Sequence, residues 1–118
     1  MGLNTSHGAW DGPYSSFNNF RRWLANQIGI NLSDYAGYMH GGEKDLTTID
    51  HPLMPLFNHS DCDGILTPDE CRQIARGLKQ VIDAAPKNNE NHCHLEAAER
   101  FRKGCIKAAN AKENLEFH

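Results

Sequence analysis

The chain has 118 residues, of which 39% are hydrophobic and 23% charged, and its formal net charge is −3 at pH 7. This length and composition predict a single globular domain over residues 1–118. The acidic balance argues against a nucleic-acid partner, which would need a basic face, and no apolar run approaches the ~20 residues of a membrane-spanning helix.

The chain start predicts a cytoplasmic protein. Residues 1–10, MGLNTSHGAW, have neither the basic start nor the apolar centre of a secretory signal. No two cysteines form a CxxC pair, so a four-cysteine zinc site is not expected, and in the cytosol free thiols are expected. The cysteines are Cys62, Cys71, Cys93 and Cys105.

The first helix is predicted after a loop over residues 1–14, which the aromatic rings of Trp10 and Tyr14 should hold against the body. Ser15 or Ser16 can cap this helix, and Gly29 follows its end. Apolar residues recur along it at helical spacing. They are Phe17, Phe20, Leu24 and Ile28.

The next third of the chain contains weaker signals. Residues 30–49 show little periodicity and predict only a short helical turn near residues 34–38. Asp50 and Pro52 fit the start of a short helix within residues 50–58.

The strongest local signal begins at Thr67. Thr67 as N-cap, Pro68 in the first turn and Glu70 three residues after Thr67 form a capping box. A helix is predicted from there to about residue 85, before Pro86.

The last helix is predicted from about residue 91 to residue 111. Its charged face offers the pairs Glu96–Arg100 and Glu99–Lys103 four residues apart, and we expect this face to be solvated. Phe117 is expected to dock the C-terminal tail onto the core.

These elements predict an all-α fold. We expect a small single-domain bundle of three main helices plus one or two short ones, with N- and C-terminal loops docked on it and no strand pair.

The segment HSDCDGILTPDE, residues 59–70, resembles the twelve-residue calcium loop of an EF-hand. With Gly64 at the sixth position, Asp61 and Asp63 fall third and fifth and Glu70 falls twelfth. The first position is His59, an imidazole where calcium favours a carboxylate, and no second loop follows.

A histidine ligand suits zinc better than calcium. His59 and Asp61 would supply two ligands, and His7 and His118 in the two terminal segments are candidates for the others. The possible cofactor is therefore a divalent metal, zinc or calcium. The alternative is a turn without metal, in which Thr67 and Glu70 cap the next helix and Asp63-Gly64 is a turn dipeptide.

Four blocks of the chain resemble a family of small bacterial and bacteriophage proteins with no assigned activity. The blocks are MGLNTSHGAW, FNNFRRWLA, HSDCDGILTPDEC and FRKGCIKAANAKENLEFH. The resemblance covers most of the length and implies a compact fold, with a phage origin as one expectation and no particular chemistry.

Three functional hypotheses follow. The first is a binding or regulatory protein with a metal at residues 59–70. The second is a cofactor-free adaptor that binds a protein partner. The third is an enzyme in which His59 or His7 acts as a base beside Asp61 or Glu116. The enzyme ranks last, because the chain has no phosphate-binding glycine loop, nucleophile elbow or HExxH motif. We favour the first hypothesis and keep the second as its alternative.

Overall fold

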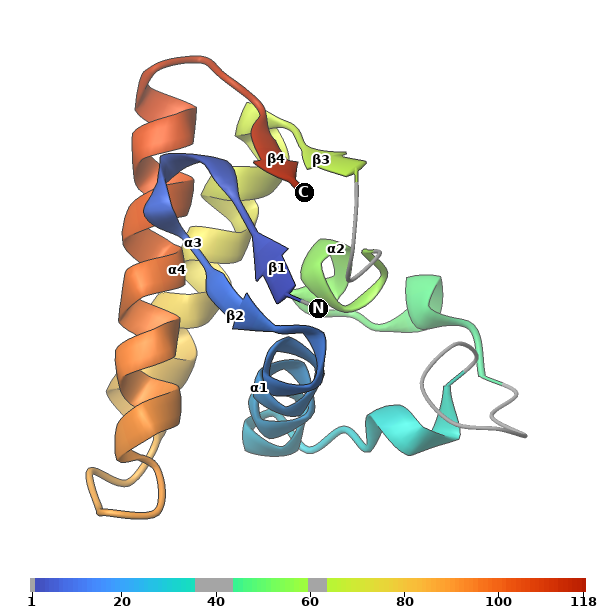
Figure 1. The fold of residues 1–118 in the computed structure, drawn as a ribbon. Helices are drawn as coiled ribbons and strands as arrows, with labels where there is room; N and C mark the ends of the chain where they lie inside the picture. Colours follow the sequence, from blue (N-terminus) through green and yellow to red (C-terminus); the bar gives the residue numbers. More distant parts are fainter. Residues whose placement is uncertain (1, 36–43, 60–63) are drawn as a thin grey trace.

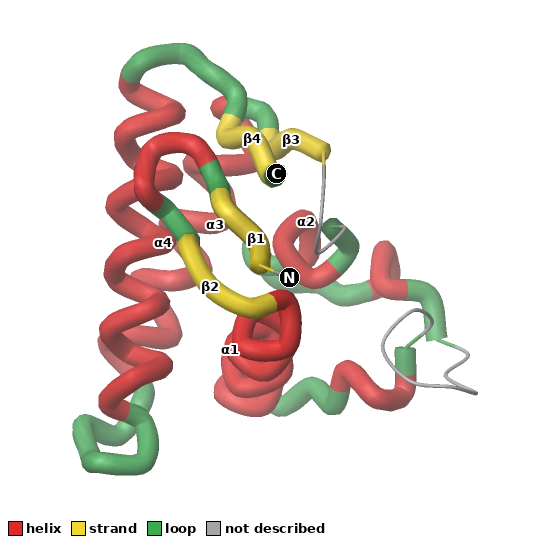
Figure 2. Tube along the Cα trace, in the orientation of Figure 1, coloured by secondary structure: helices red, strands yellow, loops and turns green. Residues whose placement is uncertain are grey.

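The computed structural model describes residues 2–35, 44–59 and 64–118, and two long helices dominate it (Figures 1 and 2). Helices α3 (Pro68–Ala84) and α4 (His92–Asn110) lie side by side. Helix α1 (Tyr14–Gln27) crosses near one end of this pair, and the short α2 (Met54–Phe57) contacts α3. In the described ranges, no helix is both long and apolar enough to cross a membrane.

The predicted start of α3 is confirmed in detail. The Thr67 hydroxyl accepts a hydrogen bond from the Glu70 amide, and the Glu70 carboxylate accepts one from the Thr67 amide. This reciprocal pair satisfies two amide donors that have no partner within the helix. The helices predicted at residues 15–28 and 91–111 are also present, within a residue or two of their expected ends.

The prediction of an all-α fold is wrong, because the chain also forms two small antiparallel sheets. Strand β1 (Gly2–Asn4) pairs with β2 (Asp11–Pro13), so the first predicted loop is largely a hairpin. Strand β3 (Gly64–Leu66) pairs with β4 (Leu115–Phe117), so the C-terminal tail docks as a strand. The fold is therefore mixed and mostly helical.

The sequence does not predict these strands, and the reason is physical. Each has three residues, which is too short for an alternation of apolar and polar residues to be recognised. Strands β3 and β4 are also far apart in the sequence, and their pairing is settled by how the helices bring them together.

The two terminal segments meet in space. Asn4 and His118 exchange two backbone hydrogen bonds, and Thr5 forms a β-bridge with Phe117. These contacts join the β1–β2 hairpin to β4, and Figure 1 shows the N- and C-terminal strands in the same region of the fold. Between β1 and β2 lies the short 3₁₀ helix η1 (Ser6–Gly8).

An aromatic cluster forms the centre of the core. Phe17, Phe20 and Phe101 are at most 1% exposed, and Phe117 is 4% exposed. The ring of Trp10 stacks on Phe20 and meets the edge of Phe17. The expected docking of Trp10 and Phe117 is therefore confirmed, and it fixes both chain ends against α1 and α4.

Two further short elements complete the described part. The 3₁₀ helices η2 (Leu32–Asp34) and η3 (Leu46–Thr48) lie in the stretch that shows little periodicity. The turn predicted near residues 34–38 falls largely outside the described residues.

Candidate functional site

His59, the first of the predicted metal ligands, contacts the loop and the C-terminal strand. Its Nε2 lies 2.9 Å from the Ile65 carbonyl oxygen, across the loop from the first position to the seventh. Its ring packs on Phe117, with ring centroids 4.1 Å apart. Gly64, at the sixth position, has a φ of 98°, which suits glycine and brings it against the imidazole.

The other predicted metal ligands are distributed over separate contacts. Glu70 is engaged in the capping box, and His118 lies 3.9 Å from a Glu116 oxygen. His7 bonds Glu113. Asp61 and Asp63 lie outside the described residues. Among residues 2–35, 44–59 and 64–118, no group of three or more His, Cys, Asp or Glu side chains is arranged to hold an ion.

The contacts of His7 define a different site, which the sequence did not predict. Its Nε2 lies 3.0 Å from Glu113 Oε1, and its Nδ1 lies 2.8 Å from Ser6 Oγ. The Glu116 amide donates to Ser6 Oγ at 2.8 Å. The residues from the N-terminal turn and the C-terminal segment thus form one hydrogen-bonded network.

The proton positions in this network follow from its partners. A carboxylate only accepts, so His7 Nε2 carries the hydrogen and Nδ1 of the neutral ring is an acceptor. The Ser6 hydroxyl therefore donates to Nδ1 while it accepts from the Glu116 amide. This assigns a relay from Ser6 through His7 to Glu113.

Backbone geometry places His7 in the relay. His7 has a φ of 60° and Gly8 a φ of 69°, so two successive residues lie in the left-handed region. Histidine enters this region more often than most side chains, although a non-glycine residue held there costs about 1–3 kcal/mol. The reversal turns the His7 ring toward Glu113.

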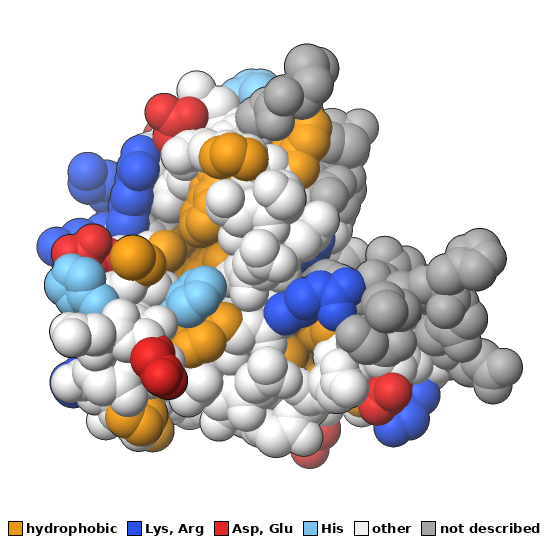
Figure 3. Space-filling view, turned by 60° about the horizontal axis from the view of Figure 1, so that its bottom comes forward, with side chains coloured by type: hydrophobic (Ala, Val, Ile, Leu, Met, Phe, Trp, Pro, Cys, Tyr) orange, Lys and Arg blue, Asp and Glu red, His pale blue; other side chains and the backbone are white. Residues whose placement is uncertain are grey.

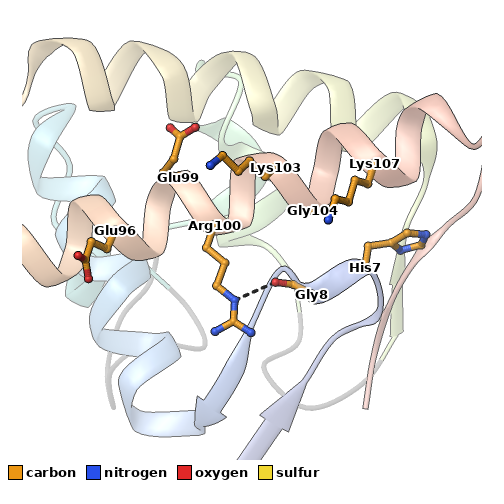
Figure 4. Close-up of a pocket in the computed structure, with 8 residues that line it drawn as sticks. All are labelled: His7, Gly8, Glu96, Glu99, Arg100, Lys103, Gly104 and Lys107. Atoms are coloured by element: carbon orange, nitrogen blue, oxygen red, sulfur yellow. Dashed lines mark hydrogen bonds between the residues drawn. The ribbon is translucent and has the colours of Figure 1, made fainter.

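Close packing against α4 holds this turn in place. A Cβ on Gly104 would lie 2.5 Å from the Ala9 Cβ and 2.8 Å from the Ala9 Cα, so only glycine allows the approach. The Arg100 Nε donates to the Gly8 carbonyl oxygen at 2.9 Å, as the dashed line in Figure 4 marks. Gly104 and Arg100 together position the turn.

A pocket of about 370 Å³ lies between this turn and α4 (Figure 4). Cationic side chains on one face of α4, from successive helical turns, line this pocket together with the imidazole of His7. The lining residues are His7, Gly8, Glu96, Glu99, Arg100, Lys103, Gly104 and Lys107. In the space-filling view, basic side chains gather on the side of the molecule where α4 lies (Figure 3).

The prediction of ion pairs along α4 is wrong, because both glutamates pair with other residues. Glu96 pairs with His92 at 3.1 Å, and Glu99 pairs with Arg102 at 3.0 Å. Each carboxylate therefore turns toward a partner other than the one expected. Within the described part of the chain, no carboxylate lies within ion-pair distance of the cations of the pocket. These cations are Arg100, Lys103 and Lys107.

Two more hollows adjoin this basic pocket. One of about 510 Å³ shares His7 and is lined by Ser6, Lys112, Glu113, Asn114 and Glu116. The other, of about 280 Å³, shares Glu96 and Arg100 and reaches Trp10, Asp11, Cys93 and Ala97. The three form one seam between the N-terminal hairpin and α4.

The buried cysteines belong to the core. Cys71 on α3 and Cys105 on α4 are both 0% exposed, and the Cys71 thiol donates to the Leu66 carbonyl oxygen, with the sulfur and oxygen 3.9 Å apart. The neighbouring Cys105 thiol lowers the pKa of Cys71, while the Cys71 thiol and burial raise the pKa of Cys105. Both side chains are part of the hydrophobic core.

The sequence contained two signals of the site that were interpreted differently. Arg100, Lys103 and Lys107 are spaced so that three cations lie on one helical face, a pattern that also predicts an ordinary solvated surface. His7 was identified as a metal ligand or base, but Ser6 and Glu113 were missed, because 106 residues separate His7 from Glu113.

Comparisons with protein-family models, curated proteins and solved structures each gave no match.

Proposed function

We propose that this protein binds a small anionic ligand, carrying phosphate or carboxylate groups, in the basic pocket between α4 and the η1 turn. The observation that supports this is the cluster of Arg100, Lys103 and Lys107, whose charges have no carboxylate of the described residues within ion-pair distance. The whole chain carries a net charge of −3, so this local excess of positive charge runs against the overall balance.

The pocket has the chemistry to hold an anion. The Arg100 guanidinium uses Nε on the Gly8 carbonyl, which fixes its plane and leaves its two terminal nitrogens for a ligand. Lys103 and Lys107 add two mobile point charges. The acidic residues of the lining weaken this field only in part, since Glu99 is already paired with Arg102.

The expected binding is moderate and depends on salt. Hydrogen bonds to charged groups contribute about 1.5–3 kcal/mol each when well formed, and exposure reduces that value. At about 0.15 M salt the screening length is ~8 Å, so raising the ionic strength should weaken the binding clearly.

Calorimetric titration with inorganic phosphate at low ionic strength tests the proposal. The double variant Lys103→Ala/Lys107→Ala should bind at least about tenfold more weakly, which corresponds to about 1.4 kcal/mol. Lys79→Ala is the matched control, because Lys79 is an exposed lysine on α3 paired with Asp83. Equal losses in both variants, or no phosphate binding to the native protein, would overturn the proposal.

Divalent-metal binding by residues 59–70 is a second proposal. It is supported by the left-handed Gly64 at the sixth position and by the Ile65 carbonyl, which points across the loop toward His59. A cation would have to replace the His59–Ile65 hydrogen bond, so it must offer coordination that outweighs this contact.

Metal analysis of protein purified without an affinity tag tests this second proposal. Zinc or calcium that binds only the folded chain should raise the melting temperature, and His59→Ala should abolish the rise. His92→Ala is the control, because His92 is an exposed residue of α4. A melting temperature unaffected by either ion would exclude the metal loop.

Two wider expectations also remain proposals. A cytoplasmic location rests on the thiols of Cys71, Cys93 and Cys105, which are free in the structure. The similarity to small bacterial and bacteriophage proteins rests on the four sequence blocks alone.

A further inference from the structure

We propose that Ser6 is a nucleophile, activated by His7 and Glu113, that cleaves esters of small carboxylic acids. The anionic part of such an ester would lie in the neighbouring basic pocket, and this choice of substrate rests on the proposed function. The nucleophile itself rests on separate observations: the hydrogen bonds of Ser6 and the hollow that it lines.

The hydrogen bonds of Ser6 leave one lone pair for attack. A hydroxyl has one hydrogen to donate and two lone pairs. The hydrogen goes to His7 Nδ1 at 2.8 Å, and one lone pair accepts the Glu116 amide at 2.8 Å. The second lone pair has no partner within the described part of the protein. The amide also stabilises negative charge on Oγ, which favours loss of its proton.

His7 is oriented as a general base. Glu113 accepts from Nε2 at 3.0 Å, which fixes the tautomer with an unprotonated Nδ1 facing Ser6. The His7 side chain is 18% exposed, whereas the Glu113 side chain is 63% exposed. A nucleophile beside a base that a third group orients is the arrangement found in serine hydrolases of unrelated folds.

The hollow of about 510 Å³ offers room for the reacting ester. Ser6 and His7 line it together with Lys112 and Asn114, whose ammonium and amide groups can meet the charge of an oxyanion. Because His7 also lines the basic pocket, an ester can extend from Ser6 toward Lys107 without leaving the seam.

The reaction balances with water as the only co-reactant. Ser6 Oγ bonds to the carbonyl carbon, and its proton passes to His7 Nδ1. The tetrahedral intermediate breaks the bond to the alcohol oxygen, which leaves with that proton. A water oxygen then bonds to the acyl carbon, and one water proton passes to His7 Nδ1. The bond from that carbon to Ser6 Oγ breaks, Oγ takes the proton back from His7, and the carboxylic acid leaves.

Covalent labelling of the intact protein by a neutral fluorophosphonate tests the nucleophile. Intact mass should show a single addition, and peptide mapping should place it on Ser6. Ser6→Ala should lose at least about 100-fold in labelling rate, while Ser16→Ala, which changes an exposed serine of α1, should label like the native protein. Labelling at another residue, or none in the native protein, would overturn the proposal.

Glu113 variants separate positioning from a purely structural role. Glu113→Gln should slow both labelling and p-nitrophenyl acetate cleavage about tenfold, and Glu113→Asp should restore part of the rate. If Glu113→Gln keeps the native rate, the relay is refuted. Because both probes are neutral, neither assay depends on phosphate binding, and Lys79→Ala, which changes an exposed lysine of α3, should leave both rates unchanged. If phosphate does not bind, only the anionic character of the substrate is refuted. The labelling experiment still tests Ser6 as the nucleophile.

Discussion

The close approach of Gly104 to Ala9 gives the sharpest test of how the site is built. In Gly104→Ala the new methyl carbon would lie 2.5 Å from the Ala9 Cβ, 2.8 Å from its Cα and 3.0 Å from its amide nitrogen. Two of these atoms belong to the backbone, so no side-chain rotation relieves the overlap. The η1 turn must move away from α4.

The magnitude is a balance of two effects. Overpacking of a closely packed contact costs about 1–3 kcal/mol, while replacing glycine by alanine inside a helix returns about 1 kcal/mol. Because the overlap in Gly104→Ala includes backbone atoms, we take the upper half of that cost, about 2–3 kcal/mol, and expect a net loss of about 1–2 kcal/mol in the free energy of unfolding. For a chain of this size that lowers the melting temperature by about 3–10 °C.

Gly77→Ala is the matched control on α3. Its new methyl would meet the Leu53 side chain at 2.7 and 2.9 Å, with backbone no closer than 3.3 Å. A side chain can shift where a backbone cannot, so we expect a loss smaller than that of Gly104→Ala. Gly77 also does not line the basic pocket.

Urea denaturation and phosphate titration of both variants provide the measurement. Gly104→Ala should lose stability and also bind phosphate more weakly, because the Gly8 carbonyl that holds Arg100 moves with the turn. Gly77→Ala should retain phosphate binding. A Gly104→Ala protein with native stability and native phosphate affinity would refute the argument that this contact positions the site.

Three further predictions concern stability. Thr67→Ala should lower the free energy of unfolding by about 1 kcal/mol in urea, because it removes the cap on the Glu70 amide. Phe117→Ala should cost about 3–5 kcal/mol by the same measurement, since the ring is 4% exposed and closes the aromatic cluster. Burial lowers the pKa of His94 and of His51 from the ordinary value of 6.5. The unfolded chain therefore binds more protons, so the unfolding free energy should fall as the pH drops below about 6.5, and His94→Gln should reduce that slope. An unchanged slope would contradict the assignment.

The sequence by itself determined the helices, because their signals are local. The capping box at Thr67 and Glu70 places the start of α3 to the residue, and the recurrence of Phe17, Phe20 and Leu24 identifies the buried face of α1. Such signals act over one or two helical turns, so each segment carries its own information. The docking of Trp10 and Phe117 was also predictable, since large rings so close to chain ends favour burial.

Only the tertiary structure decided the sheets and the candidate site. The two strand pairs are three residues long, and Leu66 faces Leu115 only because α3 and α4 bring their ends together. The same packing joins Ser6 and His7 to Glu113 across more than a hundred residues. A hydrogen bond between side chains so far apart leaves no periodicity and no spacing in the sequence. It exists because Gly104 lets the N-terminal turn reach α4, and that approach is a property of the folded chain.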